Sequence, residues 1–205
     1  MAIYLARHGQ DDERYRGGWS RRGLIEEGIR QSERLGQYLA DRSHDYPINR
    51  IVSSDLSRAQ QTAAIIADKL GIVSTSSESW RETNNGLLAG MPHSLAEENY
   101  PGLSFSSLDM DERYPGGESP RENFERIQAA FTRLCHHQQS ADPDDNILVI
   151  THGGVINIIY HIIKNVEWSN KNAFYPAGKT GLHKMEYRDG KWAFTLENST
   201  NHLQA

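Results

Sequence analysis

The sequence predicts a three-layer α/β/α protein built on a mixed, mainly parallel sheet. Short apolar, β-branched segments alternate with longer segments of helical periodicity, a pattern typical of a sheet covered by helices on both faces. The clearest buried strand is Asn146–Ile150, which is apolar at almost every position. Near the C-terminus, Asp189-Gly190 separates two alternating segments and predicts a hairpin that completes the sheet.

The N-terminal part supplies two strand–helix pairs. Ala2–Ala6 is expected to be a strand, and Glu26–Leu39 follows helical spacing, with four expected core contacts: Ile29, Leu35, Tyr38 and Leu39. Ile48–Ser53 predicts a second strand, and the helix Leu56–Leu70 follows it. A weaker strand is expected over Ile72–Thr75.

The C-terminal part continues the alternation. A long helix is expected over Ser119–Gln138, and a shorter one runs from Gly153 or Gly154 to about Lys164, directly after the buried strand. The two arms of the hairpin are expected at Thr180–Arg188 and Lys191–Glu197.

Several residues predict where helices begin and end. Ser54 or Asp55 is expected to cap the second helix, and Gly71 to end it. The long helix starts with a serine followed by proline, Ser119-Pro120, and Glu122 stands at capping-box distance. These signals support the predicted boundaries.

Length and composition predict one soluble globular domain. The chain has 205 residues, enough for a well-buried core, so a single domain over residues 1–205 is expected. A net charge of -5 argues against a nucleic-acid partner. Residues 1–22 nevertheless carry five arginines against three acids, which leaves room for a local basic pocket: Arg7, Arg14, Arg16, Arg21 and Arg22 against Asp11, Asp12 and Glu13.

The sequence favours a cytoplasmic location without a membrane partner. A single cysteine, Cys135, excludes an internal disulfide and fits a reducing compartment; its helical surroundings predict a structural thiol. The first residues reach Arg7 too soon for a secretory signal. The best apolar stretch, Val155–Ile163, is too short to span a bilayer.

The segment 86–117 differs from the rest of the chain. It is rich in Gly, Pro, Ser and Asn and has a short helical patch only near Ser94–Tyr100. Such a long excursion predicts an insertion over one edge of the domain that serves as a lid or substrate wall, the alternative being a disordered connector.

Three predicted strand ends carry an arginine or a histidine. Arg7-His8 follows the first strand, Arg58 follows the second, and His152 follows the buried strand. Because ligands bind outside the carboxyl ends of the strands in open α/β sheets, these four side chains are expected to meet. Two guanidiniums and two imidazoles around one point suit a phosphoryl group.

With these segments in view, the chain resembles the histidine phosphatase superfamily and its phosphoglycerate mutase-like fold over roughly residues 1–165. The match rests on six segments in the order of the family: Arg7-His8-Gly9, Gly28-Ile29-Arg30-Gln31, Ser53 to Thr62, Arg81-Glu82 with Gly86 and Gly90, Pro115 to Ser119, and Thr151-His152-Gly153.

The resemblance implies a role for each residue. His8 would be the nucleophile that forms a phosphohistidine, and Arg7 and Arg58 would clamp the phosphate. A cation in the first turn of a helix, as Arg58 is expected to be, opposes the helix dipole unless an anion binds there. His152 would donate to the developing charge, and the backbone N–H of Gly153 would bind a phosphate oxygen.

Glu82 is the expected general acid and base. It would protonate the leaving oxygen and then deprotonate the attacking water, and a neighbouring phosphate favours its protonated form at the start. Four other glutamates remain alternatives from the residues alone, and the family register selects Glu82 over them: Glu78, Glu97, Glu98 and Glu118.

The chain departs from the family at two places. Arg14 stands where the family often carries an Asn that binds phosphate, so Arg14 is a candidate phosphate-binding residue, with Arg16, Arg21 and Arg22 as other arginines for the pocket. After Glu82 the chain has Thr83-Asn84-Asn85, where mutases carry Arg-His-Tyr. It also lacks the longer insertion by which mutases grip their substrate.

These observations predict a metal-independent phosphatase without a cofactor that hydrolyses a small phosphorylated metabolite through His8. Two alternatives stay open: a phosphoglycerate mutase, and a module that binds a phosphorylated ligand without catalysis. Substrate selectivity is expected from residues 10–22 and 86–117.

Overall fold

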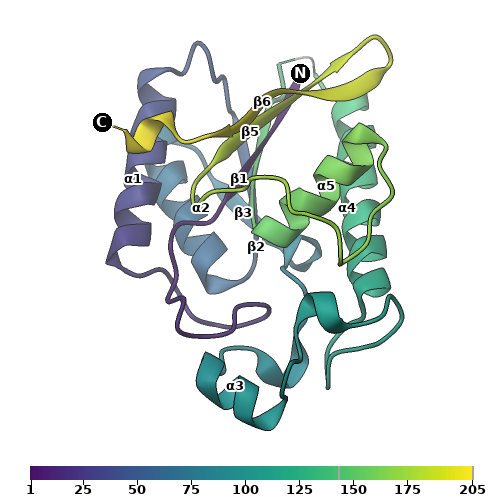
Figure 1. Cartoon of the computed structure of the whole chain (residues 1–205). Helices are drawn as coiled ribbons and strands as arrows, with labels where there is room; N and C mark the ends of the chain where they lie inside the picture. The colour runs from purple at the N-terminus through teal and green to yellow at the C-terminus, as the bar shows by residue number, and fades with distance from the viewer. Residues whose placement is uncertain (143, 205) are drawn as a thin grey trace.

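The computed structural model describes residues 1–142 and 144–204 as a six-stranded sheet between two pairs of helices (Figure 1). The strand order is β3-β2-β4-β1-β5-β6. β1, β2, β3 and β4 pair in parallel, whereas β5 and β6 are antiparallel additions at one edge. The strands are β1 (Ala2–Arg7), β2 (Arg50–Ser54), β3 (Ser74–Ser77), β4 (Ile147–Thr151), β5 (Leu182–Arg188) and β6 (Lys191–Ser199). The predicted fold class is confirmed.

Alternation along β1 divides the apolar core into two layers. Ala2, Tyr4 and Ala6 face one side, where α1 (Glu26–Asp41) and α2 (Ser57–Leu70) pack. Ile3 and Leu5 face the other side, where α4 (Pro120–Ser140) and α5 (Gly153–Lys164) pack. Because β1 is central and buried on both faces, the end of this strand is held firmly in place.

The helix-end signals were right in two cases and wrong in one. Ser119 and Glu122 form a capping box at the start of α4, and Gly71 ends α2 in the left-handed conformation with φ 65°. The prediction that Ser54 or Asp55 caps α2 is wrong, because Leu56 is the N-cap and no side chain caps this end. Asp55 instead pairs with Arg81, at 2.6 Å from Oδ1 to the guanidinium Nε.

The expected core face of α1 was partly wrong. Leu35 and Leu39 are buried and Tyr38 packs against the same core, but Ile29 is 40% exposed. The helix also buries small residues, because it approaches its neighbours closely: a Cβ on Gly28 would lie 2.1 Å from the carbonyl oxygen of Gln10. The prediction from apolar spacing was therefore wrong for Ile29.

The C-terminal hairpin is confirmed. β5 and β6 are joined by Asp189 and Gly190, whose φ angles are 51° and 78°, as a tight hairpin turn with two left-handed residues requires. β5 pairs antiparallel with β1 along Ala2–Ala6 and so covers the edge of the parallel sheet.

The segment 86–117 is folded and lies at one end of the molecule, around α3 (Figure 1). It contains α3 (His93–Asn99) and two 3-10 turns, Gly86–Leu88 and Phe105–Ser107. Its buried side chains form a small core separate from the two main layers: Leu88, Ala96, Leu108 and Tyr114. The alternative of a disordered connector is therefore wrong.

Cys135 has the environment of a structural thiol. It is buried in the layer between the sheet and α4, and burial raises the pKa of its thiol to about 12. Among the described residues, no helix is both long and apolar enough to cross a membrane.

Candidate active site

The structure brings the three predicted strand ends together. β1 lies between β4 and β5, and β4 lies between β2 and β1, so the ends of β1, β2 and β4 are neighbours. His8 follows β1, His152 follows β4 and is the N-cap of α5, and Arg58 lies in the first turn of α2. The ring centroids of His8 and His152 are 5.0 Å apart.

The hydrogen bonds of His8 define which ring nitrogen is free to attack. Nδ1 lies 2.7 Å from the carbonyl oxygen of Gly9, which only accepts, so Nδ1 carries the proton. Nε2 accepts from the Nε–H of Arg58 at 3.2 Å and therefore bears the lone pair. Burial first, and then the positive charge of Arg58, hold the pKa of His8 well below its usual range. His8 is thus a neutral imidazole with a nucleophilic Nε2.

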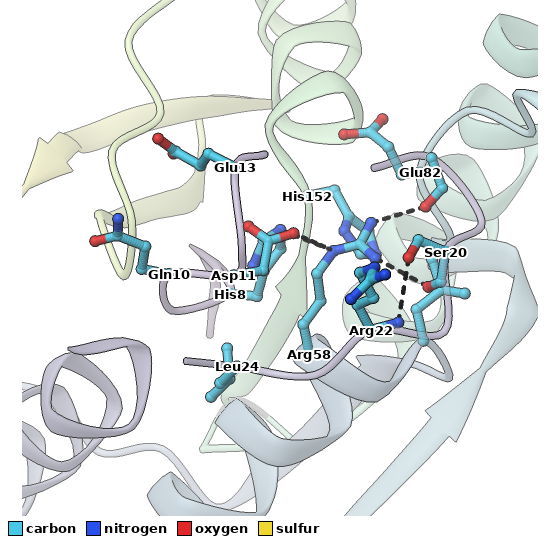
Figure 2. Close-up of polar contacts among 12 residues, drawn as sticks. His8, Gln10, Asp11, Glu13, Ser20, Arg22, Leu24, Arg58, Glu82 and His152 are labelled. Carbon is cyan, nitrogen blue, oxygen red and sulfur yellow. Dashed lines mark hydrogen bonds and ion pairs between the residues drawn. The ribbon is translucent and has the colours of Figure 1, made fainter. Parts of the chain in front are cut away.

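Arg58 is a buried cation that is oriented by hydrogen bonds to His8, Gly18 and Ser20. Its side chain is 2% exposed, and it donates to the carbonyl oxygen of Gly18 at 2.8 Å. It also donates to the carbonyl oxygen of Ser20 at 3.2 Å (Figure 2). Burial lowers its pKa, but guanidinium stays charged at physiological pH. A charge with so little water around it favours an anionic ligand.

Asp11 and Lys179 form an ion pair beside His8 that sequence reasoning missed. Lys179 Nζ lies 2.8 Å from Asp11 Oδ1, and Asp11 Oδ2 lies 3.6 Å from Arg58 Nε, the contact drawn in Figure 2. Burial by itself raises the pKa of Asp11, yet the nearby His8, Lys179 and Arg58 lower it overall. The two residues are 168 positions apart, so no local pattern links them.

Arg7 and His152 add buried hydrogen-bond donors to the cluster around His8. Arg7 donates through Nη1 to the carbonyl oxygen of Ala177 at 2.9 Å, while its buried Nε has no partner among the described residues. His152 Nε2 contacts Ser54 Oγ at 2.9 Å, and its buried Nδ1 likewise lacks a described partner. Burial, followed by the charge of Arg58, lowers the pKa of His152 well below its usual range.

Ser54 sets the orientation of the His152 ring. Ser54 Oγ accepts from the backbone N–H of Leu56 at 3.3 Å. The same hydroxyl still has its O–H to donate, and donation to Nε2 corresponds to the tautomer with the ring proton on Nδ1. His152 then presents an N–H donor to the cluster without carrying a charge.

Glu82 lies at the rim of the cluster, at the start of α5. Its Oε2 accepts from the backbone N–H of Gly154 at 3.1 Å, and its Oε1 accepts from that of Thr83 at 3.1 Å. A Cβ on Gly154 would lie 2.3 Å from Glu82 Oε1, so a side chain at this position would displace the carboxylate. Gly153 lies against Arg7, where a Cβ would meet the guanidinium carbon at 3.5 Å.

The backbone of Glu82 is held by Arg126, a second residue that sequence reasoning missed. Arg126 donates to the carbonyl oxygens of Arg81 at 3.0 Å and Glu82 at 3.2 Å, and it pairs with Glu118 at 2.7 Å. Glu118 also accepts from the backbone N–H of Asn84 at 2.8 Å. The Pro115-to-Ser119 motif therefore serves to fix the loop that carries the acid.

Other motif residues fix the loop that carries His8. A Cβ on Gly9 would lie 2.3 Å from the carbonyl oxygen of Gly28, so both glycines allow α1 to touch the loop. Thr62 accepts from the backbone N–H of Gly9 at 3.0 Å and donates to the carbonyl oxygen of Arg58 at 2.8 Å. Gln31 accepts from the backbone N–H of Gln10 at 2.9 Å.

The four N-terminal arginines behave differently from one another. Arg14, a predicted phosphate-binding residue, is not brought into the cluster: its side chain is 83% exposed and pairs with Asp12. The local reason is a turn in which Asp12 also accepts the backbone N–H of Arg14. Arg21 is exposed, and Arg22 stacks on Tyr15 at 3.3 Å from the ring centroid. Arg16 lines a pocket next to Glu82.

That pocket has a volume of about 310 Å³ and opens beside the cluster. Its lining residues include Glu82, Gly154, which is two positions after His152, and Gly18, whose carbonyl oxygen accepts from Arg58. Four of the lining residues come from the segment 86–117. Further lining residues are Thr83, Asn85, Leu88, His93, Phe105, Tyr114 and Phe174.

Chemically, the cluster combines a neutral nucleophile with two guanidiniums, an imidazole N–H and a carboxyl group at its rim. Cations and donors that already point to one place stabilise the charge of a phosphoryl group in transit. No group of three or more metal-ligating side chains of His, Cys, Asp or Glu occurs among the residues that the structure describes.

Comparisons with known proteins agree with this geometry. The model of the histidine phosphatase superfamily (branch 1) matches residues 3–200. A protein of Salmonella choleraesuis named probable phosphoglycerate mutase GpmB is 27% identical over 198 residues, which cover 94% of this chain and 87% of that protein.

Solved structures show the same fold. The mycobacterial glucosyl-3-phosphoglycerate phosphatase in complex with VO3 is 25% identical, with a TM-score of 0.79 and coverage of 97% of this chain and 98% of that one. The alpha-ribazole phosphatase from Shigella flexneri is 21% identical, with a TM-score of 0.77 and coverage of 98% and 97%. The family match covers nearly the whole described chain, and the expected fold and histidine cluster are both present. The chain belongs to the histidine phosphatase superfamily.

Proposed function

We propose that this protein is a phosphatase that hydrolyses a small phosphomonoester through a phosphohistidine on His8. One observation carries the proposal: the lone pair of His8 Nε2 lies among buried cations and donors that have the charge to bind a phosphoryl group. A cluster of this kind is costly to bury unless an anion compensates it.

In the first half-reaction, His8 Nε2 attacks phosphorus in line and forms a P–N bond. The ester P–O bond breaks, and Glu82 in its acid form gives its proton to the leaving oxygen, so the alcohol departs neutral. Arg7, Arg58 and His152 donate to the phosphoryl oxygens during transfer. Arg58 Nε donates to His8 Nε2 and would transfer this hydrogen bond to a phosphoryl oxygen when Nε2 attacks phosphorus.

In the second half-reaction, a water molecule attacks the phosphorus of phosphohistidine. The Glu82 carboxylate accepts a proton from that water, the P–N bond breaks, and inorganic phosphate and neutral His8 are released. Glu82 returns to its acid form, so the cycle balances without a metal or cofactor. The backbone N–H groups of Gly154 and Thr83, which hold the Glu82 carboxyl group, support the use of this one group in both steps.

The names of related proteins support phosphate chemistry and leave two reactions to compare. A solved structure of the mycobacterial glucosyl-3-phosphoglycerate phosphatase holds inorganic phosphate, at 25% identity and a TM-score of 0.78. The Salmonella relative, in contrast, is named a mutase. Here Thr83 and Asn84 stand where mutases carry an arginine and a histidine, and the side-chain oxygen of Asn84 accepts from the backbone N–H of Gly86 at 3.0 Å. Hydrolysis is therefore the reaction that we propose.

A trapping experiment tests the proposal. The protein is mixed with ³²P-labelled phenyl phosphate, quenched, and examined for acid-labile, base-stable phosphate on the protein. Labelling in the wild type and its loss in His8→Ala are expected. Turnover that is unchanged in His8→Ala would contradict the mechanism. Conversion of 3-phosphoglycerate to its 2-isomer, stimulated by the bisphosphate, would assign the protein as a mutase instead.

A further inference from the structure

We propose that the pocket beside Glu82 selects substrates whose leaving alcohol carries both a flat apolar ring and a carboxylate, the carboxylate being bound by Arg16. This inference rests on the proposed function, since it concerns the part of the substrate that departs. The pocket is lined by Glu82, which would protonate the leaving oxygen, by Gly154 and Arg16, and by an aromatic wall.

Arg16 is fixed in the pocket by its backbone. Its N–H donates to the carbonyl oxygen of Met91 at 2.8 Å, and its own carbonyl oxygen accepts from Gly90 at 2.9 Å. Tyr15 and Pro92 form an antiparallel bridge next to these bonds. The N-terminal loop and the segment 86–117 therefore pair as a short ladder, and Arg16 is carried by it.

The guanidinium of Arg16 has no ion pair within the described residues, and its buried Nε has no hydrogen-bond partner there. The neighbouring Arg14, in contrast, is neutralised by Asp12. The other charged side chain in the same pocket is Glu82, whose oxygens already accept two backbone N–H groups. A half-buried cation with unused donors is suited to a carboxylate of the ligand.

The wall opposite is apolar and aromatic. Phe105 and Tyr114 stack with an interplanar angle of 12° and centroids 6.5 Å apart, and Leu88 lies beside them in the same small core. Burial raises the pKa of Tyr114 to about 12, so its ring stays neutral. Phe174, which is 60% exposed, lies at the pocket from the other side. Such walls favour a flat apolar group by burial and stacking.

Hydrogen bonds link the segment 86–117, which carries Phe105 and Tyr114, to the loop that carries Phe174. Asn170, a few residues before Phe174, donates to the carbonyl oxygens of Phe105 at 2.6 Å and Leu108 at 2.8 Å. Phe105 also contacts the Trp168 ring, with centroids 6.2 Å apart. The pocket is therefore shaped before the substrate arrives, which favours discrimination between leaving groups.

Three phosphomonoesters separate the two features of the leaving group: phenyl phosphate has a ring, 3-phosphoglycerate a carboxylate, and 3-carboxyphenyl phosphate both. In the wild type, kcat/KM is expected to be about ten- to hundred-fold higher for carboxyphenyl than for phenyl phosphate, as a charge-assisted hydrogen bond provides. Arg16→Ala is expected to abolish this ratio, and Arg16→Lys to retain part of it. Arg21→Ala, an exposed arginine of the same segment, is the matched control and should keep the ratio.

Phe174→Ala tests the ring independently, because this exposed side chain contributes little to the core. It should lower kcat/KM for both aryl phosphates by about three- to ten-fold and leave 3-phosphoglycerate unaffected. A wild-type ratio near one, or a ratio that survives in folded Arg16→Ala, would overturn the inference. Either result together with a normal phosphohistidine on His8 leaves the proposed function intact, whereas absence of the phosphohistidine refutes that function.

Discussion

The cluster around His8 and the pocket beside Glu82, proposed to bind the phosphoryl group and the leaving group, are adjacent but built in different ways. The cluster takes its side chains from the ends of three buried neighbouring strands, whereas the pocket takes its walls from loops with their own small core. Under the proposed function, the strand ends hold the side chains that act on the phosphoryl group of every substrate. The loops line the pocket that receives the leaving group, which differs between substrates. If this division holds, changes in the cluster affect all substrates alike, and changes in the pocket affect only some.

The largest effect is expected from His8→Ala, which removes the nucleophile. We expect kcat/KM to fall by at least about 10⁴-fold for every phosphomonoester tested, because no other group replaces Nε2. Steady-state assays on phenyl phosphate and 3-phosphoglycerate measure it, with His44→Ala as a control at an exposed histidine. A loss of kcat/KM that is confined to one substrate would contradict the claim that the cluster acts on all substrates alike.

Glu82→Gln is expected to have the next largest effect. Loss of the acid and base should lower kcat by about 10²- to 10⁴-fold. For a reactive leaving group that needs no proton, phosphohistidine should accumulate, because only its hydrolysis still needs a base. Glu78→Gln, whose side chain is 76% exposed, is the matched control. Rapid phosphohistidine breakdown in Glu82→Gln would show that another group activates the water.

Two neighbouring glycines offer a finer test of how Glu82 is placed. In Gly154→Ala the new Cβ would lie 2.3 Å from Glu82 Oε1, whereas in Gly153→Ala the nearest atom, in Arg7, is 3.5 Å away. We expect kcat/KM to drop by about 10²-fold in Gly154→Ala, since a displacement of about 1 Å costs that much, and much less in Gly153→Ala. Equal losses in both variants would mean that the helix start, rather than the acid, is being disturbed.

The smallest effect concerns the ion pair beside the nucleophile. Burial is the largest cause of the lowered pKa of His8, and four charged groups act on that pKa as well: Arg58, Asp11, Lys179 and Arg7. Lys179→Met removes one cation and leaves Asp11 uncompensated, so the pKa of His8 should rise. Neutral His8 would then be lost at a higher pH than in the wild type.

Ring ¹⁵N NMR of His8 across pH measures that shift directly, with Lys171→Met as a control at an exposed lysine. Asp11→Asn should shift the pKa of His8 in the opposite direction, because the carboxylate raises it. A His8 titration that is the same in all variants would exclude a role for the pair in tuning the nucleophile.

Sequence reasoning predicted the cluster well because each part obeys a local rule. A buried β-branched strand can be read from composition, and the residues just beyond parallel strands meet at one edge of the sheet. Arg7, His8, Arg58 and His152 therefore followed from three short segments. The hairpin turn was equally local, since Asp189-Gly190 suits left-handed conformations.

What the sequence did not predict depends on contacts between distant segments. Lys179 reaches Asp11 across 168 positions from a loop without regular structure. Whether Arg14 or Arg16 faces the pocket depends on the bridge between Tyr15 and Pro92, and nothing in either segment alone reveals that pairing. Arg126 lies on α4, and it reaches the carbonyl oxygen of Glu82 only because this helix packs next to the loop that carries Glu82.

The most direct test of this division measures the two half-reactions separately by rapid quench. With phenyl phosphate and 3-carboxyphenyl phosphate, phosphohistidine should form at different rates in the wild type and at similar rates in Arg16→Ala. It should break down at one common rate with both substrates and in both proteins, because the leaving group has departed before water attacks. A breakdown rate that depends on the substrate, or turnover without a phosphohistidine on His8, would contradict the account.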